Sequence, residues 1–201
     1  MTDQPAEGAP FVHATAEVAP GSVGPDTFVW HQAQVMPGAR VGARCTLGKA
    51  SFIGAGANLG DDVKVGNHAD VFGATVEDGA FLGPHSCVLE DPTPRTLTVD
   101  GRRRGPGDWT ARPAHIGPGA SVGAAAVVLP GTRVGALAMV AAGSVVNRDV
   151  PAHALVGGNP ARQLGWVCRC GARLDDTLAC ACGLRYVEAA DGLDEVGGPA
   201  G

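Results

Sequence analysis

The residues with the clearest chemistry lie near the C-terminus, where four cysteines form two short motifs. The motifs read Cys-Arg-Cys-Gly and Cys-Ala-Cys-Gly, and nine residues separate them. Four thiolates at that separation can close a tetrahedral structural zinc site, which would let a short appendage fold without a core of its own. Because the spacing is Cys-x-Cys rather than Cys-x-x-Cys, free thiols or disulfides are the alternative. The predicted ligands are Cys168, Cys170, Cys180 and Cys182.

Two of the six histidines, His68 and His85, are 17 residues apart. An imidazole changes its charge near neutral pH, so it can accept a proton from an attacking nucleophile. Asp70 and Asn67 are close enough in the sequence to orient the His68 ring. Whether the two rings can act together depends on the elements that carry them, and a repeat in the sequence indicates what those elements are.

An aliphatic residue recurs at every sixth position through most of the chain. The series runs from Val23 to Val71, slips by one residue to Val76, and returns from Ile116 to Val146 after a break. A six-residue period fits neither a helix nor simple strand alternation. It fits short strands joined by tight corners, where the glycines that often follow the aliphatic residues relieve crowding and permit positive φ. We therefore predict an all-β solenoid with three repeats per coil, with aliphatic residues stacked inward and a small residue four positions later in each corner.

The repeat places the two histidines on one edge of this solenoid. Each lies three residues after an inward aliphatic residue, Val65 or Leu82, and one repeat between them, 71–75, has five residues instead of six. Their separation therefore equals one coil, and the rings should stack with a backbone spacing of about 4.8 Å. The competing interpretation is that each is simply a solvent-facing corner residue.

Composition narrows the class of protein. The chain has 201 residues with 31 Gly and 15 Pro, which argues against a helical fold, and 45% hydrophobic residues, which argues against disorder. A formal net charge of -5 lacks the basic surface that nucleic acid or an anionic membrane selects, so we expect neither partner. The N-terminus does not resemble a secretory signal, and the six cysteines favour a reducing cytoplasm.

The repeat resembles that of the bacterial hexapeptide-repeat acyltransferases, whose domain is a left-handed parallel β-helix. The left-handed winding is implied by this resemblance alone, because crossover connections are ordinarily right-handed. The segment DVPAHALVGGNPARQLGW, residues 149–166, is similar to the end of the coil domain in acetyl-CoA-dependent members, although it could merely end a solenoid. The resemblance implies that acetyl-CoA lies along the last coils with its phosphates near an arginine. The implied cofactor-binding residues are Ala141, Ala142, Gly143, Gly158, Asn159, Pro160 and Arg162.

Four further segments resemble bacterial enzymes that acetylate the amino group of nucleotide-linked 3-amino sugars. They read FVHATAEV, VWHQAQVMPGARVGARCTLG, FLGPHSCVLEDPTPRT and GNPARQLGWVCRCG, and the likeness spans residues 11–172. It implies a homotrimer with active sites between subunits, in which the amine of a small-molecule acceptor attacks acetyl-CoA directly. It also implies that Trp30 and His31 line the site and that Asp91 and Arg95 meet the nucleotide, since a guanidinium suits a diphosphate.

The sequence departs from these relatives at the two histidines, where they usually carry Asn or Ser, and at Val71, where their repeat is one residue longer. His68 is therefore either a general base that close relatives lack, oriented by Asp70 or Asn67, or the mark of a different acceptor such as a hydroxyl. His85 would then line the acceptor. The remaining alternatives are an acyltransferase for a non-nucleotide small molecule, a zinc hydrolase of carbonic anhydrase type, and a non-catalytic solenoid.

The other segments complete the predicted organisation. The hexad is interrupted between residues 90 and 115, where we predict a long loop. This loop carries five arginines in an otherwise acidic protein, so it is either a binding element or a solvated basic loop. His13, His115 and His153 are expected to be structural or surface residues. We predict a flexible leader at 1–10, the β-helix at 11–164 with a long loop at 90–115, the zinc-ribbon-like appendage at 165–188, and a disordered tail at 189–201.

Overall fold

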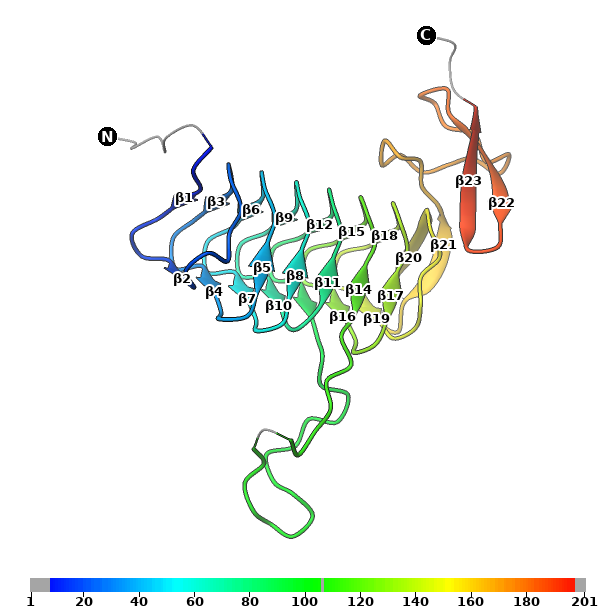
Figure 1. Ribbon diagram of the computed structural model, residues 1–201. Coiled ribbons are helices and arrows are strands. Elements are labelled where there is room, and N and C mark those ends of the chain that lie inside the picture. The colour runs from blue at the N-terminus through cyan, green and yellow to red at the C-terminus, as the bar shows by residue number, and fades with distance from the viewer. Residues whose placement is uncertain (1–7, 106, 198–201) are drawn as a thin grey trace.

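The computed structural model describes residues 8–105 and 107–197, and these residues form strands, turns and loops without a helix. Figure 1 shows a solenoid of stacked coils, a loop that projects from one side, and a small appendage at the C-terminal end. The predicted all-β solenoid is therefore confirmed. Because the described residues form no helix, they also contain no membrane-spanning helix.

Three sheets form the sides of the solenoid. Sheet A contains β1 (Phe11–Val12), β3 (Phe28–Val29), β6 (Thr46–Leu47), β9 (Lys64–Val65), β12 (Phe81–Leu82), β15 (Ser121–Val122), β18 (Met139–Val140), β20 (Ala154–Gly157) and β21 (Arg162–Trp166). Sheet B contains β2 (Glu17–Val18), β4 (Gln34–Val35), β7 (Phe52–Ile53), β10 (Asp70–Val71), β13 (Cys87–Val88), β16 (Val127–Val128) and β19 (Val145–Val146). Sheet C contains β5 (Arg40–Val41), β8 (Asn58–Leu59), β11 (Thr75–Val76), β14 (His115–Ile116) and β17 (Arg133–Val134).

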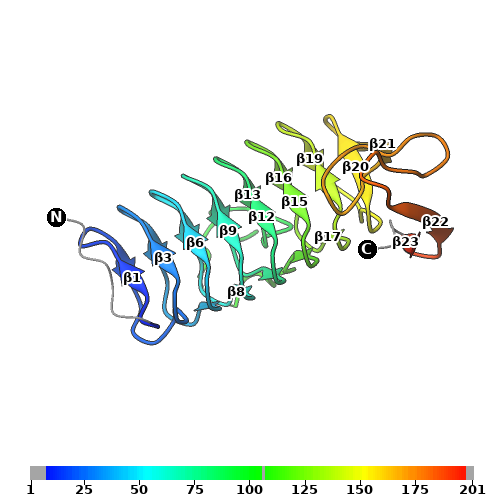
Figure 2. The ribbon, with the colours of Figure 1, turned by 90° about the horizontal axis from the view of Figure 1, so that it is seen from above.

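The chain visits sheets A, B and C in turn, so three short strands make one coil. Neighbouring strands are parallel, except that β21 runs antiparallel to β20. We number the coils from 1 to 8 by the strands of sheet A from β1 to β20. Figure 2, seen from above, shows the coils as a regular series that ends at the appendage.

The core of the solenoid consists of the predicted aliphatic positions. In each two-residue strand of sheets B and C from β4 onward, the second residue is buried and the first is at least partly exposed. Leu47, Ile53, Leu82 and Ile116 have no measurable exposure. The small residues that follow four positions later are also buried, as at Ala33. The six-residue rhythm therefore records the alternation of inward strand residues and inward corner residues.

Glycine follows many inward residues because successive coils approach closely there. A Cβ on Gly83 would lie 2.5 Å from the backbone N of Ala124 in the next coil. The expected crowding is therefore confirmed, but the expectation of positive φ at these glycines is wrong. Positive φ occurs two residues later in the corner, at His68 (φ 56°) and His85 (φ 58°).

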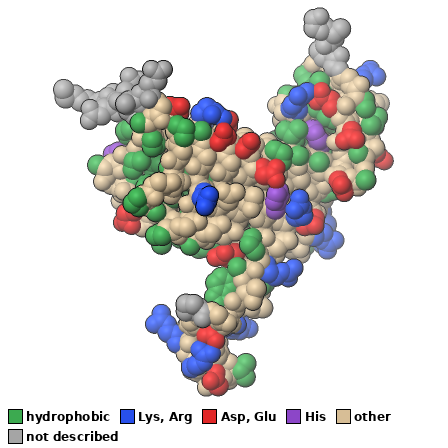
Figure 3. Space-filling model, viewed as in Figure 1, with side chains coloured by type: hydrophobic (Ala, Val, Ile, Leu, Met, Phe, Trp, Pro, Cys, Tyr) green, Lys and Arg blue, Asp and Glu red, His purple; other side chains and the backbone are tan. Residues whose placement is uncertain are grey.

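The long loop leaves the solenoid after β13 and returns at β14, so it spans residues 89–114. This is one residue earlier at each end than predicted, because His115 already pairs within sheet C. At the base of the loop, the Arg112 N–H donates to the Glu90 carbonyl at 2.8 Å. Figure 3 shows cationic and acidic side chains gathered on the outer part of the loop.

The C-terminal residues correct one prediction. Residues 189–197 are part of an antiparallel hairpin of β22 (Arg185–Ala189) and β23 (Gly192–Gly197), not of a disordered tail. Tyr186 and Leu193 from the two strands are buried in a small apolar cluster with the cysteines. Residues 1–7 of the predicted leader and residues 198–201 lie outside the described residues.

The appendage is attached to the last coil by backbone and side-chain contacts. The Ala152 N–H donates to the Asp191 carbonyl at 2.8 Å, next to the hairpin turn. His153 is buried, with Nδ1 2.9 Å from the Val167 carbonyl oxygen and its ring 4.9 Å from that of Tyr186. His153 is thus a structural residue, as expected.

Candidate active-site edge

The corners between sheets A and B form one continuous edge, which we call the A–B edge. A ladder of backbone hydrogen bonds aligns them: the His68 N–H donates to the Lys49 carbonyl at 2.8 Å, and the His85 N–H donates to the Asn67 carbonyl at 3.0 Å. The same contact joins Gly143 to the Ala124 carbonyl. Equivalent corner positions therefore stand in rows along the solenoid. The edge comprises residues 13–16, 30–33, 48–51, 66–69, 83–86, 123–126, 141–144 and 158–161.

His68 and His85 stack on this edge, as the sequence predicts. Their ring centroids are 4.9 Å apart and the rings are tilted by 5° from parallel. Both side chains are exposed. Their left-handed backbone conformation belongs to the corner rather than to the histidines, because Ala50 and Ala125 at the same corner position also have positive φ. The fold thus presents two imidazole rings side by side to solvent.

Asp70 adds a carboxylate close to the histidine pair. It lies on β10 directly beside Cys87 of β13. Partial burial raises the pKa of Asp70, and the nearby His68 and His85 rings oppose that shift. Burial, and then the Asp70 charge, raise the pKa of the Cys87 thiol, which makes Cys87 a poor nucleophile at neutral pH.

Asn67 is oriented toward the backbone of the edge. Its Oδ1 accepts a hydrogen bond from the Lys49 N–H at 2.9 Å. Among the described residues, no hydrogen bond joins His68 to Asn67 or to Asp70. Asp70 therefore acts on the imidazoles through its charge, whereas Asn67 fixes the corner.

The predicted cofactor residues gather at the C-terminal end of the same edge. Ala141, Ala142 and Gly143 form the corner of coil 7, and the Gly158 N–H in the next corner donates to Ser144 Oγ at 3.1 Å. The N–H groups of Ala124 and Ala142 find no backbone acceptor in the described part of the chain. These N–H groups belong to exposed residues with small side chains, and such donors can bind the carbonyl groups of an extended ligand.

Arg162 lies apart from this row, in a pocket of about 270 Å³ at the end of the solenoid. Arg148 lines the same pocket, and Val146, Val150 and Val156 contribute apolar lining. Neither arginine forms an ion pair among the residues described. Sequence reasoning missed Arg148, although it directly precedes the segment that resembles acetyl-CoA-dependent relatives.

An aromatic cluster occupies the N-terminal end of the edge. The Trp30 ring lies 5.6 Å from Phe11 and 6.4 Å from Phe28, and about 40% of the Trp30 surface is exposed. His31 stacks on His13 with ring centroids 3.6 Å apart. The structure therefore brings Trp30 and His31 to the edge that carries His68. The sequence repeat did not predict the His13–His31 pair, because these two histidines occupy different positions in their corners.

Asp91 and Arg95 are not brought to this edge within one chain. They lie on the projecting loop, which leaves the solenoid at the corner between sheets B and C. Asp91 Oδ1 accepts a hydrogen bond from the Thr93 N–H at 2.8 Å, and the Arg95 side chain is exposed. His115 directly follows the loop at the start of β14, and its Nε2 lies 2.7 Å from Glu77 Oε1.

The four C-terminal cysteines converge as predicted. Their sulfur atoms all lie within 4.8 Å of one another, with 3.5 Å between Cys168 and Cys182 and 3.6 Å between Cys170 and Cys180. Each Cys-x-Cys-Gly motif forms the same turn, since Gly171 and Gly183 donate to the carbonyls of Cys168 and Cys180.

The chemistry of this cluster suits a cation. Burial disfavours the Cys168 thiolate, but a hydrogen bond with the Tyr186 hydroxyl and further bonds from the neighbouring cysteines lower the pKa of Cys168 to about 6. Four sulfurs from two equivalent turns match the donor set of a tetrahedral thiolate site. Elsewhere in the described residues, no other group of three histidines, cysteines or acids is close enough to hold a metal.

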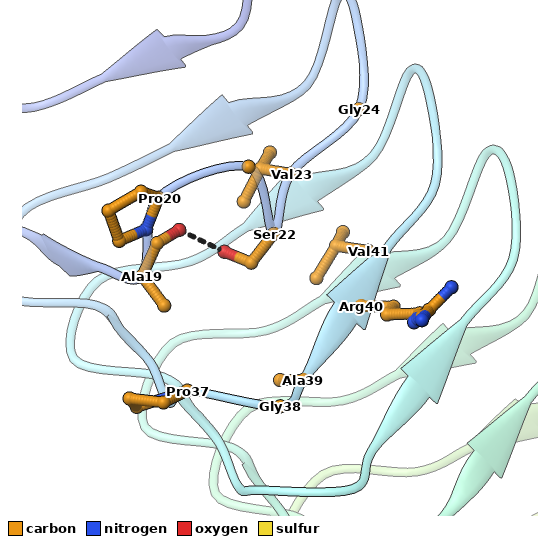
Figure 4. A pocket seen from close by; sticks show the side chains of 11 residues that line it. Ala19, Pro20, Ser22, Val23, Gly24, Pro37, Gly38, Ala39, Arg40 and Val41 are labelled. Carbon is orange, nitrogen blue, oxygen red and sulfur yellow. Dashed lines mark hydrogen bonds between the residues drawn. The ribbon is translucent and has the colours of Figure 1, made fainter.

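Another pocket lies away from the A–B edge, at the first two corners between sheets B and C. Its volume is about 730 Å³, and Figure 4 shows the Ser22 hydroxyl directed at the Ala19 carbonyl while Arg40 points away. Its lining contains no acid, histidine or cysteine. This pocket offers no group for proton transfer or metal binding.

Comparisons with known proteins agree with the repeat. The family described as hexapeptide repeat of succinyl-transferase matches residues 38–67 and 113–148. A dTDP-3-amino-3,6-dideoxy-alpha-D-galactopyranose 3-N-acetyltransferase of Aneurinibacillus thermoaerophilus is 51% identical over 53 residues, which are 25% of this chain and 27% of the relative. The chain thus matches about a quarter of that enzyme's length.

A solved structure shows the same fold. It is the acetyltransferase domain of PglB from Neisseria gonorrhoeae in complex with acetyl coenzyme A, with a TM-score of 0.52 and 22% identity. The match covers 79% of this chain and 58% of that one. Together with the repeat match, it confirms the expected hexapeptide-repeat fold.

Proposed function

We propose that this hexapeptide-repeat protein transfers an acetyl group from acetyl-CoA to the amine of a nucleotide-linked amino sugar. One observation carries the proposal: the A–B edge aligns the stacked His68 and His85 with the small-residue corners at 141–143 and 158–160. The acceptor class comes from the 3-amino-sugar N-acetyltransferase that shares 51% identity over 53 residues.

The spacing of the coils suits a long thioester. Two coils separate His85 from Ala142, which is about 10 Å along the edge. A pantetheine arm bound to the free N–H groups of Ala124 and Ala142 would reach the histidines with its thioester. Its phosphates would then extend toward Arg162 and Arg148, whose guanidinium groups suit anionic oxygens.

The reaction needs one proton acceptor and no covalent intermediate with the protein. The neutral amine attacks the carbonyl carbon of the thioester, the C–S bond breaks, and coenzyme A leaves as a thiolate that then takes up a proton. His68 accepts the proton that the amine loses, and the Asp70 carboxylate favours the resulting imidazolium. His85 contacts the acceptor beside it. Much of the acceleration would come from holding the two reactants together.

We propose a homotrimer because one edge of a single solenoid is convex. A groove for two reactants then needs a second wall, and a neighbouring copy can supply it. The same arrangement would let Asp91 and Arg95 on the projecting loop reach a neighbour's edge. Light scattering should give the mass of three 20.1 kDa chains, and a monomer would contradict this assembly.

We also propose that the four cysteines hold a structural zinc ion. A closed set of four protein ligands leaves no open position for substrate, and zinc would supply the cross-link between the two turns. Reduced thiols fit the expected cytoplasmic location. Metal analysis should find one zinc per chain, lost in the double variant Cys168→Ser/Cys180→Ser and kept in Cys87→Ser. Stoichiometric zinc in the double variant would contradict the assignment.

A screen of acceptors tests the activity itself. Acetyl-CoA consumption should be stimulated by a nucleotide-linked amino sugar, with one N-acetylated product formed per coenzyme A released. The matching sugar with a hydroxyl in place of the amine is the control, and it should be inactive. Consumption with the hydroxyl sugar alone would identify an O-acyltransferase instead.

A further inference from the structure

The side chains of the A–B edge change character in order along the solenoid. Coil 2 presents Trp30 and His31, coil 3 presents Lys49, and coils 4 and 5 present the stacked histidines. His31 and Lys49 occupy the same corner position, since their carbonyls accept hydrogen bonds from Ala50 and His68 of the following coils, at 2.9 Å and 2.8 Å. An aromatic group, a cation and an imidazole thus lie on successive coils, whose backbones are about 4.8 Å apart, and His68 stands one corner position after the one that Lys49 occupies.

Lys49 is the cation of this series and its ammonium group is available. The residue is exposed, and no carboxylate of the described chain lies within ion-pair distance of it. Its backbone N–H is held by Asn67 Oδ1 at 2.9 Å. The corner is therefore fixed through the backbone, and the Lys49 side chain has no hydrogen-bond or ion-pair partner among residues 8–105 and 107–197.

The aromatic end of the series offers a stacking surface. Trp30 and Phe28 are each about 40% exposed although they pack against each other and Phe11. Exposed aromatic rings bind nucleobases by stacking, and this contact tolerates different bases. His31 lies 6.3 Å from Trp30 with the two rings nearly parallel, at 6°.

We propose that Lys49 binds the diphosphate of the acceptor and that the Trp30 and Phe28 surface holds its nucleobase. In a nucleotide-linked sugar the diphosphate stands between the base and the sugar. A ligand with its base on coil 2 and its amine at His68 on coil 4 therefore places its diphosphate at coil 3. The inference rests on the proposed function, and it gives Lys49 the contact that sequence analysis assigned to Arg95.

This assignment also sets the direction in which the reactants enter. The acceptor would lie on the N-terminal coils and acetyl-CoA on the C-terminal coils, so that they meet at coils 4 and 5. An ammonium group binds phosphate as a point charge, so its loss should weaken binding without altering the chemical step. Lys49 is thus a binding residue for the acceptor.

Calorimetry with thymidine diphosphate and with thymidine tests the proposal directly. Lys49→Gln should weaken binding of thymidine diphosphate about tenfold and leave thymidine unchanged, because a charge-assisted contact is lost. Trp30→Ala should weaken both ligands. In turnover assays, Lys49→Gln should raise KM for the nucleotide-linked sugar while kcat and the KM for acetyl-CoA stay the same.

Lys64→Gln is the matched control, because Lys64 is exposed on sheet A one coil further along, with Nζ 5.9 Å from the Phe81 ring centre. Its binding constants should equal those of the unmodified protein. A loss in Lys64→Gln instead of Lys49→Gln would place the diphosphate on the face of sheet A and overturn the proposal.

Two further results separate this inference from the proposed function. If the protein acetylates an amino sugar but binds thymidine diphosphate no better than thymidine, the inference is overturned and the function stands. If the protein does not bind acetyl-CoA, the proposed function fails, and the inference that rests on it fails too.

Discussion

At the residue scale, His68 carries the proton transfer proposed for this protein. His68→Asn should lower kcat about a hundredfold, because an amide cannot accept the proton of the attacking amine. Asn tolerates the left-handed conformation of this corner (φ 56°), so the variant should fold normally. Steady-state kinetics with a saturating acceptor would measure the effect.

His13→Asn is the control for this experiment, since His13 lies on the same edge but three coils away. The kcat of His13→Asn should equal that of the unmodified protein. An unaltered rate in His68→Asn would assign proton removal to another group.

Asp70 should show opposite effects on stability and on activity. Burial raises the pKa of its carboxyl above 3.8 in the folded protein, so the folded state binds the proton more tightly than the unfolded state. The favourable contribution of Asp70 to the free energy of unfolding is therefore fully present below pH 3.8. It is lost as the pH rises through the pKa that Asp70 has in the folded protein.

Asp70→Asn should consequently raise the unfolding midpoint at pH 7 relative to the unmodified protein, and the difference should shrink as the pH approaches 4. The same variant should lower kcat, because the charge beside the histidines is removed. Urea unfolding across this pH range, with parallel rate measurements, tests both effects. A variant that is less stable at pH 7 would show that Asp70 is a structural residue.

The stacked histidines were predictable because their position depends on counting. His68 and His85 are 17 residues apart, and because one of the three repeats between them is shortened, this separation equals one coil. The result does not depend on how the side chains pack. The place of Arg148 was not predictable in this way, because it depends on how β21 folds back over the last coil. The Trp30 cluster likewise depends on side-chain packing with Phe11 and Phe28 across two coils.

At the scale of elements, the close stacking of the coils should make certain glycines irreplaceable. Gly83→Ala should destabilise the protein by roughly 2 to 3 kcal/mol, because the new Cβ would lie 2.5 Å from the backbone N of Ala124. Gly56→Ala is the control: its Cβ would meet nothing within 4 Å, and the positive φ of 79° alone should cost about 1 kcal/mol. Equal midpoints in chemical denaturation would contradict close stacking.

If the four cysteines hold zinc as proposed, the appendage should respond to metal removal as a separate element. Chelation should increase amide hydrogen exchange in β22 and β23, whose Tyr186 and Leu193 pack among the cysteines. Exchange in coils 2 to 5 should not change, because their hydrogen bonds are internal to the solenoid. Unchanged exchange in the hairpin after complete metal loss would contradict a structural role for zinc.

The elements themselves were only partly predictable from the sequence. The coils follow from the hexad because an inward residue is required at the same place in every strand. The hairpin at 185–197 has no such repeat, and its buried residues Tyr186 and Leu193 stand among Gly and acidic residues that are typical of disorder. Its order depends on contacts with the cysteine turns and with Ala152 of the last coil.

At the scale of the whole molecule, the regularly stacked coils place functional side chains at fixed intervals along one edge of the solenoid. The regular spacing of the coils brings an aromatic surface, a lysine, two imidazoles and two small-residue corners to the same edge. The loop and the appendage leave this edge from other sides, so the edge stays open to solvent and to a neighbouring copy. The direction of the loop could not be predicted, because its sequence contains no hexad that ties it to a coil.

The most direct test of this account is a crystal structure of the protein with coenzyme A and a dTDP-linked 3-amino sugar. We predict that coenzyme A lies along the A–B edge, with its sulfur beside coils 4 and 5 and its phosphates near Arg148 and Arg162. The amine of the sugar should lie within hydrogen-bond distance of a His68 ring nitrogen. Coenzyme A bound away from this edge, or an amine remote from His68, would contradict the account.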